Sequence, residues 1–259
     1  MGSEKPDNFS LPTFLYVSLR SVLTYLIVSI YLLIAGPIGL LIGVPFKIKG
    51  ILYFLGHIGV GLALALAGIR YRVHGRERVP KGRAVVFCSN HESNVDPPVL
   101  FQALHRRLHV LFKAELKKVP ILGKVMVAGG FVPVERDRRE ASMASIDEAA
   151  ASIRRGNSFL IFPEGTRSRT SELLPFKKGG FIMAIKAQAP IVPVAVSGGR
   201  SSMQKGSWLV RPVMVDVRIG EPVETTGYSV DDRDQLIEIV RRRIEDLLAQ
   251  DPSPRTQIP

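Results

Sequence analysis

Two long stretches without a charged side chain stand near the start of the chain. Residues 21–46 and residues 51–69 contain no Asp, Glu, Lys or Arg. Each stretch is close to the ~20 apolar residues that a helix needs to cross about 30 Å of hydrocarbon. We therefore expect residues 1–70 to form a membrane-associated segment of two helices.

The pattern leaves the topology of these two helices open. Gly36 and Pro37 interrupt the first stretch, so its uninterrupted helix is expected to end near Ala35. Basic residues flank both stretches, so the distribution of positive charge assigns no orientation; they are Arg20, Lys47, Lys49, Arg70 and Arg72. A hairpin across the bilayer and a pair of helices dipping into one leaflet both fit, and we favour the second. A buried soluble hairpin would need a large partner surface.

From Tyr71 onward the chain alternates between short apolar runs and longer amphipathic ones. The short runs predict strands at residues 83–88, 108–112, 131–135, 158–162, 190–197 and 213–219. The amphipathic runs predict helices at residues 97–105, 140–155, 179–188 and 232–248. Strands that alternate with helices indicate an α/β fold, here a mixed central sheet flanked by helices. We assign residues 71–250 to this domain and residues 251–259 to a loose C-terminal tail.

A histidine and an aspartate stand five positions apart where the first of these strands ends. His91 is expected in the turn that leaves the strand, and Asp96 at the N-cap of a helix that begins with two prolines. In a turn Asp96 can accept the Nδ1 proton of His91 and leave Nε2 free as a base. This is the orienting half of a catalytic triad, with the substrate supplying the hydroxyl. A capping aspartate beside a surface histidine is the alternative.

Three further blocks follow in order, at residues 130–136, 162–167 and 189–194. The second, Phe-Pro-Glu-Gly-Thr-Arg, presents a carboxylate, a flexible glycine and a guanidinium after a buried strand. The planar fork of Arg167 suits a phosphate, although an Arg–Glu pair on a surface turn is an alternative. Together with the Asn-His-x-Ser-x-x-Asp motif at residues 90–96, the blocks resemble those of the 1-acylglycerol-3-phosphate acyltransferase family of glycerolipid acyltransferases. The resemblance covers about residues 70–220.

The resemblance implies a membrane enzyme that transfers a fatty acyl group from a thioester to the sn-2 hydroxyl of lysophosphatidic acid, giving phosphatidic acid. The donor would be acyl-CoA or an acyl carrier protein, no metal or bound cofactor is needed, and the α/β domain would lie on the cytoplasmic face of the inner or plasma membrane. It implies His91 and Asp96 as catalytic residues. The implied substrate-binding residues are Lys113, Arg136, Glu164, Gly165, Thr166 and Arg167.

Three other functions stay open at this point. One is acyl transfer to another lysophospholipid. Another is a membrane-bound lipid or thioester hydrolase, in which water or Ser93 replaces the lipid hydroxyl. The third is a non-catalytic protein that binds anionic lipid. For Lys113 a surface lysine, and for Arg136 a solvated turn, are the plainer interpretations.

The charge balance narrows the class of partner. The chain carries a formal net charge of +12, and the part after residue 70 holds 30 basic and 21 acidic residues, a net charge of +9. Such an excess favours nucleic acid, anionic lipid or phosphorylated substrates. The basic stretches contain few aromatic residues and no nucleic-acid-binding signature, so we rank lipid headgroups first.

The remaining candidate residues are few. One cysteine, Cys88, excludes an intrachain disulfide and fits a reducing compartment. It belongs to a strand, where a thiol is usually inert, and Ser93 is expected to brace its turn. Residues 177–180, Lys-Lys-Gly-Gly, precede a helix and could hold an anion. We interpret His57, His105 and His109 as structural.

Overall fold

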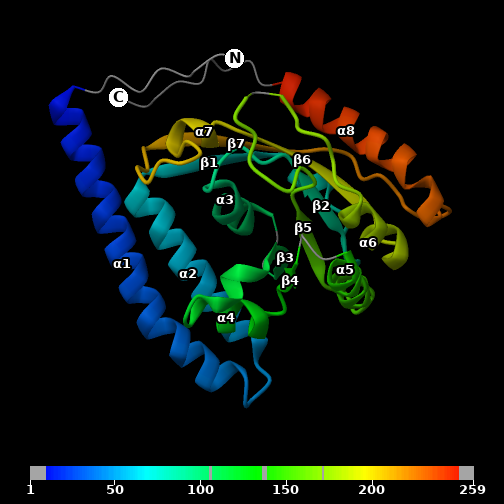
Figure 1. The fold of residues 1–259 in the computed structure, drawn as a ribbon, viewed down its shortest axis with the longest axis horizontal. Helices are drawn as coiled ribbons and strands as arrows, with labels where there is room; N and C mark the ends of the chain where they lie inside the picture. The colour runs from blue at the N-terminus through cyan, green and yellow to red at the C-terminus, as the bar shows by residue number, and fades with distance from the viewer. Residues whose placement is uncertain (1–9, 105–106, 136–138, 171, 251–259) are drawn as a thin grey trace.

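Two long apolar helices lie side by side along one flank of the molecule (Figure 1). The computed structural model describes residues 10–104, 107–135, 139–170 and 172–250. Helix α1 spans Leu11–Gly43 and α2 spans Lys49–Ala67. The expected end of the first helix near Ala35 is wrong, because α1 continues through Gly36 and Pro37. A proline removes one hydrogen bond of the ladder, and packing of this half of α1 against α2 and α4 offsets that loss.

Seven strands form one mixed sheet. They are β1 (Ile69–His74), β2 (Val86–Ser89), β3 (Leu108–Lys113), β4 (Val132–Val134), β5 (Ser158–Ile161), β6 (Ile191–Ser197) and β7 (Val213–Ile219). Their order across the sheet is β1-β7-β6-β2-β5-β3-β4. Only the β6–β7 pair is antiparallel among these neighbours. The expected fold class is confirmed, and six of the strands correspond to the predicted apolar runs.

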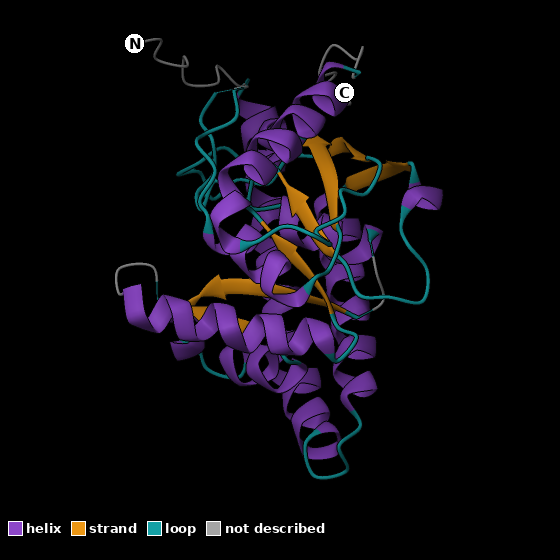
Figure 2. Cartoon of the chain, turned by 90° about the vertical axis from the view of Figure 1, so that its right-hand side faces the viewer, coloured by secondary structure: helices purple, strands orange, loops and turns teal. Residues whose placement is uncertain are grey.

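Helices cover both faces of this sheet (Figure 2). The helices that follow α2 are α3 (Asp96–Ala103), α4 (Leu122–Gly129), α5 (Arg139–Arg154), α6 (Gly179–Ala187), α7 (Gly199–Ser202) and α8 (Arg233–Ala249). Successive side chains of a strand point to opposite faces. Accordingly Phe87 packs in a core with α2 and α3, whereas Val86 and Cys88 pack in a second core with α5, α6 and α8.

Helix α4 has no counterpart among the predicted elements, and it closes one side of the site described below. It begins after a tight turn in which Leu122 N–H donates to the Pro120 carbonyl at 2.6 Å, with Ile121 at φ 62°. A β-branched residue rarely adopts this conformation. A methyl group on Gly36 would lie 2.3 Å from Ile121 Cγ2, so the side chain of Ile121 fills the space left by that glycine. Packing on α1 therefore holds the strained turn.

The last helix agrees with its predicted amphipathic pattern. The predicted inward residues Leu236, Val240, Ile244 and Leu247 of α8 are buried. Ile237 is half-buried and packs against the same core. The predicted tail, residues 251–259, and the polar residues 1–9 lie outside the described part of the chain.

Candidate active site

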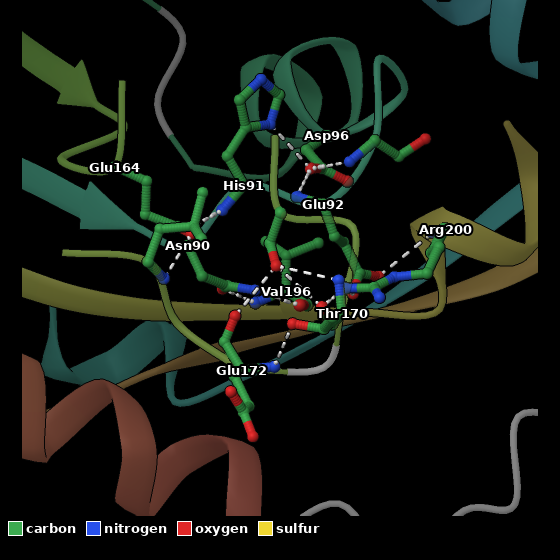
Figure 3. A network of polar contacts seen from close by, with 12 residues as sticks. Asn90, His91, Glu92, Asp96, Glu164, Thr170, Glu172, Val196 and Arg200 are labelled. Carbon is green, nitrogen blue, oxygen red and sulfur yellow. Dashed lines mark hydrogen bonds and ion pairs between the residues drawn. The ribbon is translucent and has the colours of Figure 1, made fainter. Parts of the chain in front are cut away.

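Three loops meet beyond the carboxyl ends of β2, β5 and β6. These strands are neighbours and parallel, so the segments that follow them emerge at the same edge of the sheet. We call residues 90–96 the catalytic turn and residues 163–170 the 163–170 loop. Helix α7, which follows β6, carries Gly199 and Arg200, and Figure 3 shows Arg200 and Glu164 on opposite sides of the site. The sheet therefore brings together motifs that are far apart in the sequence.

The two residues expected to be catalytic are in direct contact. Asp96 Oδ2 lies 2.9 Å from His91 Nδ1 and also accepts the N–H groups of Glu92 and Ser93, at 2.8 and 2.7 Å. Because this oxygen already accepts two N–H groups, the geometry suits donation by Nδ1 of the tautomer whose Nε2 can act as a proton acceptor. Figure 3 shows Nε2 on the side of the ring away from Asp96.

The predicted N-cap role of Asp96 is wrong. Val95 occupies the N-cap position of α3 and Asp96 is the first residue of the helix. A capping side chain accepts from N–H groups that follow it, whereas the Asp96 carboxylate turns back to the N–H groups that precede it. This orientation of the carboxylate places it against the imidazole.

Main-chain and aromatic contacts fix the position of His91. Its N–H donates to Glu164 Oε1 at 2.7 Å, and its carbonyl accepts the Ser168 N–H at 2.8 Å. The imidazole stacks on Phe162, with the ring centres 4.2 Å apart. Below it, the side chain of Asn90 pairs with both the N–H and the carbonyl of Val196 on β6. The ring is therefore held by both neighbouring strands.

Glu164 lies beneath the loop rather than on a cavity wall. Its side chain is buried, and its second oxygen accepts the Leu174 N–H at 2.9 Å. Burial raises the pKa of the Glu164 carboxyl above its ordinary value, and the two N–H donors oppose that rise. The arrangement suits bracing of His91, and the expected contact of Glu164 with substrate stays a prediction.

A cavity of about 1120 Å³ opens beside His91. The polar side chains of its lining include His91, Lys113, Thr166, Arg167 and Lys177. Its apolar part is formed by side chains of α2, α3 and α4, namely Leu52, Tyr53, Val60, Phe101, Leu122, Val125 and Met126. Space of this size can hold a large ligand, and the lining of this cavity combines cations with a larger number of apolar side chains.

The cations that line the cavity differ in their partners. Arg167 Nη1 is buried without a hydrogen-bond partner in the described residues. Lys177 has no ion pair there either, whereas Lys178 next to it pairs with Asp234. Lys113 is more than half exposed and lies 3.2 Å from Glu115. Arg136 falls outside the described residues. Arg167 and Lys177 are thus the least neutralised of the described cavity cations.

Two glycines bring the start of α6 to the same place. Gly179 and Gly180 line the cavity, and a methyl group on Gly180 would lie 2.4 Å from Ile161 Cδ1. The first N–H groups of a helix lack intrahelical partners and attract anions. On the opposite side Gly165 adopts φ 68°, and a Cβ there would lie within 2.9 Å of the Lys177 ammonium. The weak sequence signal of residues 177–180 thus coincides with the cavity.

Neither alternative nucleophile faces the cavity. Cys88 is fully buried, and burial raises the pKa of its thiol above the ordinary value. Ser93 is buried and donates its hydroxyl to the Met203 carbonyl at 2.9 Å, which agrees with its expected bracing position. Within the residues that the structure describes, no three His, Cys, Asp or Glu side chains form a group suited to a metal ion.

Gly199 is a residue of the site that the sequence did not indicate. A methyl group there would lie 2.5 Å from Asp96 Oδ1 and 3.2 Å from Ser93 Cβ. We expect Gly199→Ala to displace the carboxylate and lower turnover by up to about a hundredfold, because misplacement by 1 Å can have that effect. Measurement of kcat on protein whose fold is checked by circular dichroism tests this.

The matched control is Gly61→Ala in α2, where an added methyl group meets its nearest neighbour at 3.4 Å. It should leave kcat within about twofold, since alanine is also the better helix former. A fully active Gly199→Ala protein would mean that the position of Asp96 tolerates this displacement.

Comparisons with known proteins agree on one kind of relative. Residues 70–197 match the family model described as Acyltransferase. The chain is 33% identical to a 1-acyl-sn-glycerol-3-phosphate acyltransferase of Limnanthes douglasii over 71% of its own length and 66% of the relative. It is also 33% identical to 1-acyl-sn-glycerol-3-phosphate acyltransferase beta of Homo sapiens, over 68% of this chain and 63% of the human protein. The matched part thus spans about two thirds of these relatives.

A solved structure is similar over nearly the whole chain. The crystal structure of the 1-acyl-sn-glycerophosphate (LPA) acyltransferase from Thermotoga maritima superposes with a TM-score of 0.78 at 27% sequence identity. The match covers 92% of this chain and 99% of the other. The similarity therefore includes the region of the two N-terminal helices as well as the α/β domain.

Proposed function

The chain belongs to the 1-acyl-sn-glycerol-3-phosphate acyltransferase family, and we propose that it esterifies the sn-2 hydroxyl of lysophosphatidic acid with an acyl group from a thioester, giving phosphatidic acid. The observation that carries this is the His91–Asp96 pair at a cavity that is lined by both cationic and apolar side chains. A lysophospholipid offers a matching group for each kind of lining, namely an anionic headgroup and a hydrocarbon chain.

The chemistry needs one group that first accepts and then donates a proton. His91 Nε2 takes the proton of the acceptor hydroxyl while that oxygen attacks the thioester carbonyl carbon. The tetrahedral intermediate then collapses with cleavage of the carbon–sulfur bond, and His91 returns the proton to the departing thiolate. Asp96, held by two N–H groups, keeps Nε2 facing the cavity and stabilises the imidazolium.

The donor is a soluble thioester, and the acceptor comes from the membrane. Acyl-CoA and acyl carrier protein are both anionic, and the excess of positive charge after residue 70 attracts either one. The lipid product distinguishes this reaction from its alternatives, because both transfer and thioester hydrolysis release a thiol. We propose an assay of purified protein in detergent with a panel of lysolipids and both donors, in which thiol release and lipid products are followed together.

The assay separates acyl transfer from hydrolysis. Transfer to lysophosphatidic acid yields one diacyl lipid for each thiol released. A free fatty acid in place of the diacyl lipid would identify a hydrolase. Faster transfer to another lysophospholipid would identify that lipid, and not lysophosphatidic acid, as the acceptor. Lipid binding without thiol release from either donor would leave a non-catalytic protein.

Arg167 is the residue on which the phosphate contact is tested. A charge-assisted hydrogen bond contributes about 1.5–3 kcal/mol, so Arg167→Ala should raise the KM for lysophosphatidic acid more than tenfold. Arg167→Lys should recover little of this, because a lysine lacks the planar fork. Steady-state kinetics with varied acceptor measures both effects.

Arg169→Ala is the control for that experiment, since Arg169 lies in the same loop but is exposed and does not line the cavity. Its acceptor KM should stay close to that of the unchanged protein. If the KM of Arg167→Ala is unaltered, the phosphate contact would be assigned instead to Lys177 and the start of α6. These are the other poorly neutralised positive groups of the cavity.

The two N-terminal helices, long and apolar enough to cross a membrane, are consistent with membrane association. We propose that they lie in one leaflet. The Ser21 hydroxyl accepts the Val210 N–H at 2.9 Å near one end of α1, and Gly36 packs against Ile121 near the other. The two contacts are about 22 Å apart along the helix axis, so a helix that crossed the bilayer would carry one of them deep into the membrane, away from a domain in water. We place that domain on the cytoplasmic face, which suits the soluble donor.

A further inference from the structure

Arg200 connects the two functional loops of the site. It lies at the start of α7, directly after Gly199, and its side chain is 13% exposed. Its backbone N–H donates to Glu92 Oε1 at 3.2 Å, and its Nη2 lies 3.7 Å from Glu92 Oε2. The same Nη2 donates to the carbonyl of Thr170 (Figure 3). One guanidinium therefore contacts the catalytic turn and the 163–170 loop at once.

We propose that Arg200 is a positioning residue that keeps the acceptor hydroxyl in register with His91 by fixing the distance between the catalytic turn and the 163–170 loop. The proposal rests on the function proposed above. The turn carries His91 and Asp96, and the loop carries Arg167, the expected phosphate contact. A phosphate and a hydroxyl of one small molecule bind to these two segments, so their separation decides whether the hydroxyl reaches Nε2.

The contacts of Arg200 close a ring that includes both segments. The Thr170 carbonyl that Arg200 binds also accepts the Ser168 hydroxyl at 2.8 Å. The Ser168 N–H in turn donates to the His91 carbonyl at 2.8 Å. On the other side of the ring, the Glu92 N–H donates to Asp96 Oδ2. A displacement of the Arg200 side chain would therefore displace both His91 and Asp96 through these hydrogen bonds.

The segment that carries Arg200 is itself well anchored. Its carbonyl at Met203 accepts the Ser93 hydroxyl, and Lys205 donates to the Thr166 hydroxyl and the Arg167 carbonyl, both at 3.1 Å. Further along, the Val210 N–H is bound by α1. A residue on a fixed support can define a distance between two loops, which a residue on a free loop cannot.

The ion pair between Arg200 and Glu92 is buried, so its loss would affect the stability of the fold. The Glu92 side chain is only 8% exposed, so solvent replaces little of what Arg200 supplies. Removal of one partner from a buried pair leaves an uncompensated charge, which destabilises a protein strongly. The single variant Arg200→Met would therefore mix a loss of folding with a loss of positioning, and a neutral double variant separates the two.

The test compares two acceptors that differ only in the phosphate. We would measure kcat/KM for lysophosphatidic acid and for the matching 1-monoacylglycerol, in the full chain, in Glu92→Gln/Arg200→Met and in Arg200→Lys. The double variant should lose about tenfold or more with lysophosphatidic acid and much less with monoacylglycerol. The preference for the phosphorylated acceptor would collapse by about the same factor. Arg200→Lys keeps the charge but cannot reach both partners, so it should be intermediate.

Arg242→Met is the matched control, because Arg242 forms an exposed ion pair with Glu238 on α8 at 2.8 Å. It should leave both rates and their ratio unchanged. An equal loss with both acceptors in the double variant would overturn the proposal, since a merely structural role lowers both rates together. Failure of the unchanged protein to acylate lysophosphatidic acid would instead overturn the proposed function.

Discussion

His91→Ala is expected to lower kcat for acyl transfer by about 10²- to 10⁴-fold, the range that a positioned general acid–base supplies. The imidazole is the group that lies between Asp96 and the cavity, and its removal leaves the hydroxyl proton without an acceptor. The fold should survive, because the main-chain contacts of residue 91 to Glu164 and Ser168 do not involve the ring. Thiol release and circular dichroism on the same preparation measure the two effects separately.

Asp96→Asn should reduce the rate by a similar factor for a different reason. An amide cannot compensate the imidazolium, and its NH₂ group would face N–H donors if it replaced Oδ2. Binding of the acceptor should persist in both variants. Near-normal turnover in His91→Ala would refute its assignment as the base.

Cys88→Ser serves as the control for covalent catalysis. Cys88 is buried in β2 and burial disfavours its thiolate, so the serine variant should remain active. A folded but inactive Cys88→Ser protein would instead point to an acyl-thioester intermediate on the enzyme.

The sequence predicted those parts of the site that depend on neighbours in the chain. The five-residue spacing of His91 and Asp96 allowed their contact in a turn, and only the further motif blocks made that contact the favoured interpretation over a capping aspartate beside a surface histidine. It was not enough to predict which N–H groups the carboxylate accepts, and so the expected N-cap was wrong. The strands were predictable since buried apolar runs of this length rarely form anything else within an α/β pattern.

The parts that were missed depend on contacts between distant segments. Arg200 meets Glu92 across 108 positions of the sequence, and no local pattern marks either residue. Helix α4 begins directly after a strained Ile121 whose side chain packs against Gly36 of α1, and α1 passes through Pro37 because α2 and α4 pack on it. In each case tertiary packing overrides a local preference, which sequence periodicity does not report.

Leu26→Asp/Leu33→Asp is expected to release the protein from lipid vesicles. Leu19, Leu26 and Leu33 recur every seven residues on α1 and are 62%, 54% and 60% exposed, so they form an apolar stripe that nothing in the described chain covers. An aspartate at the centre of a membrane helix costs about 2.5–3.5 kcal/mol. Even if each of the two aspartates costs only half of this free energy, partitioning of the protein into the membrane would weaken about a hundredfold. Vesicle flotation measures it.

The same charges placed elsewhere provide the control. Gln235→Asp/Ala249→Asp adds two aspartates at exposed positions of α8, on the side of the molecule away from α1 (Figure 1), and should leave flotation unchanged. The α1 variant should keep its rate on a short-chain acceptor in solution, because the stripe lies outside the cavity lining. Its rate on long-chain acceptor in vesicles should fall, since each CH₂ lifted into water costs about 0.8 kcal/mol. Unchanged flotation would show that another surface binds the membrane.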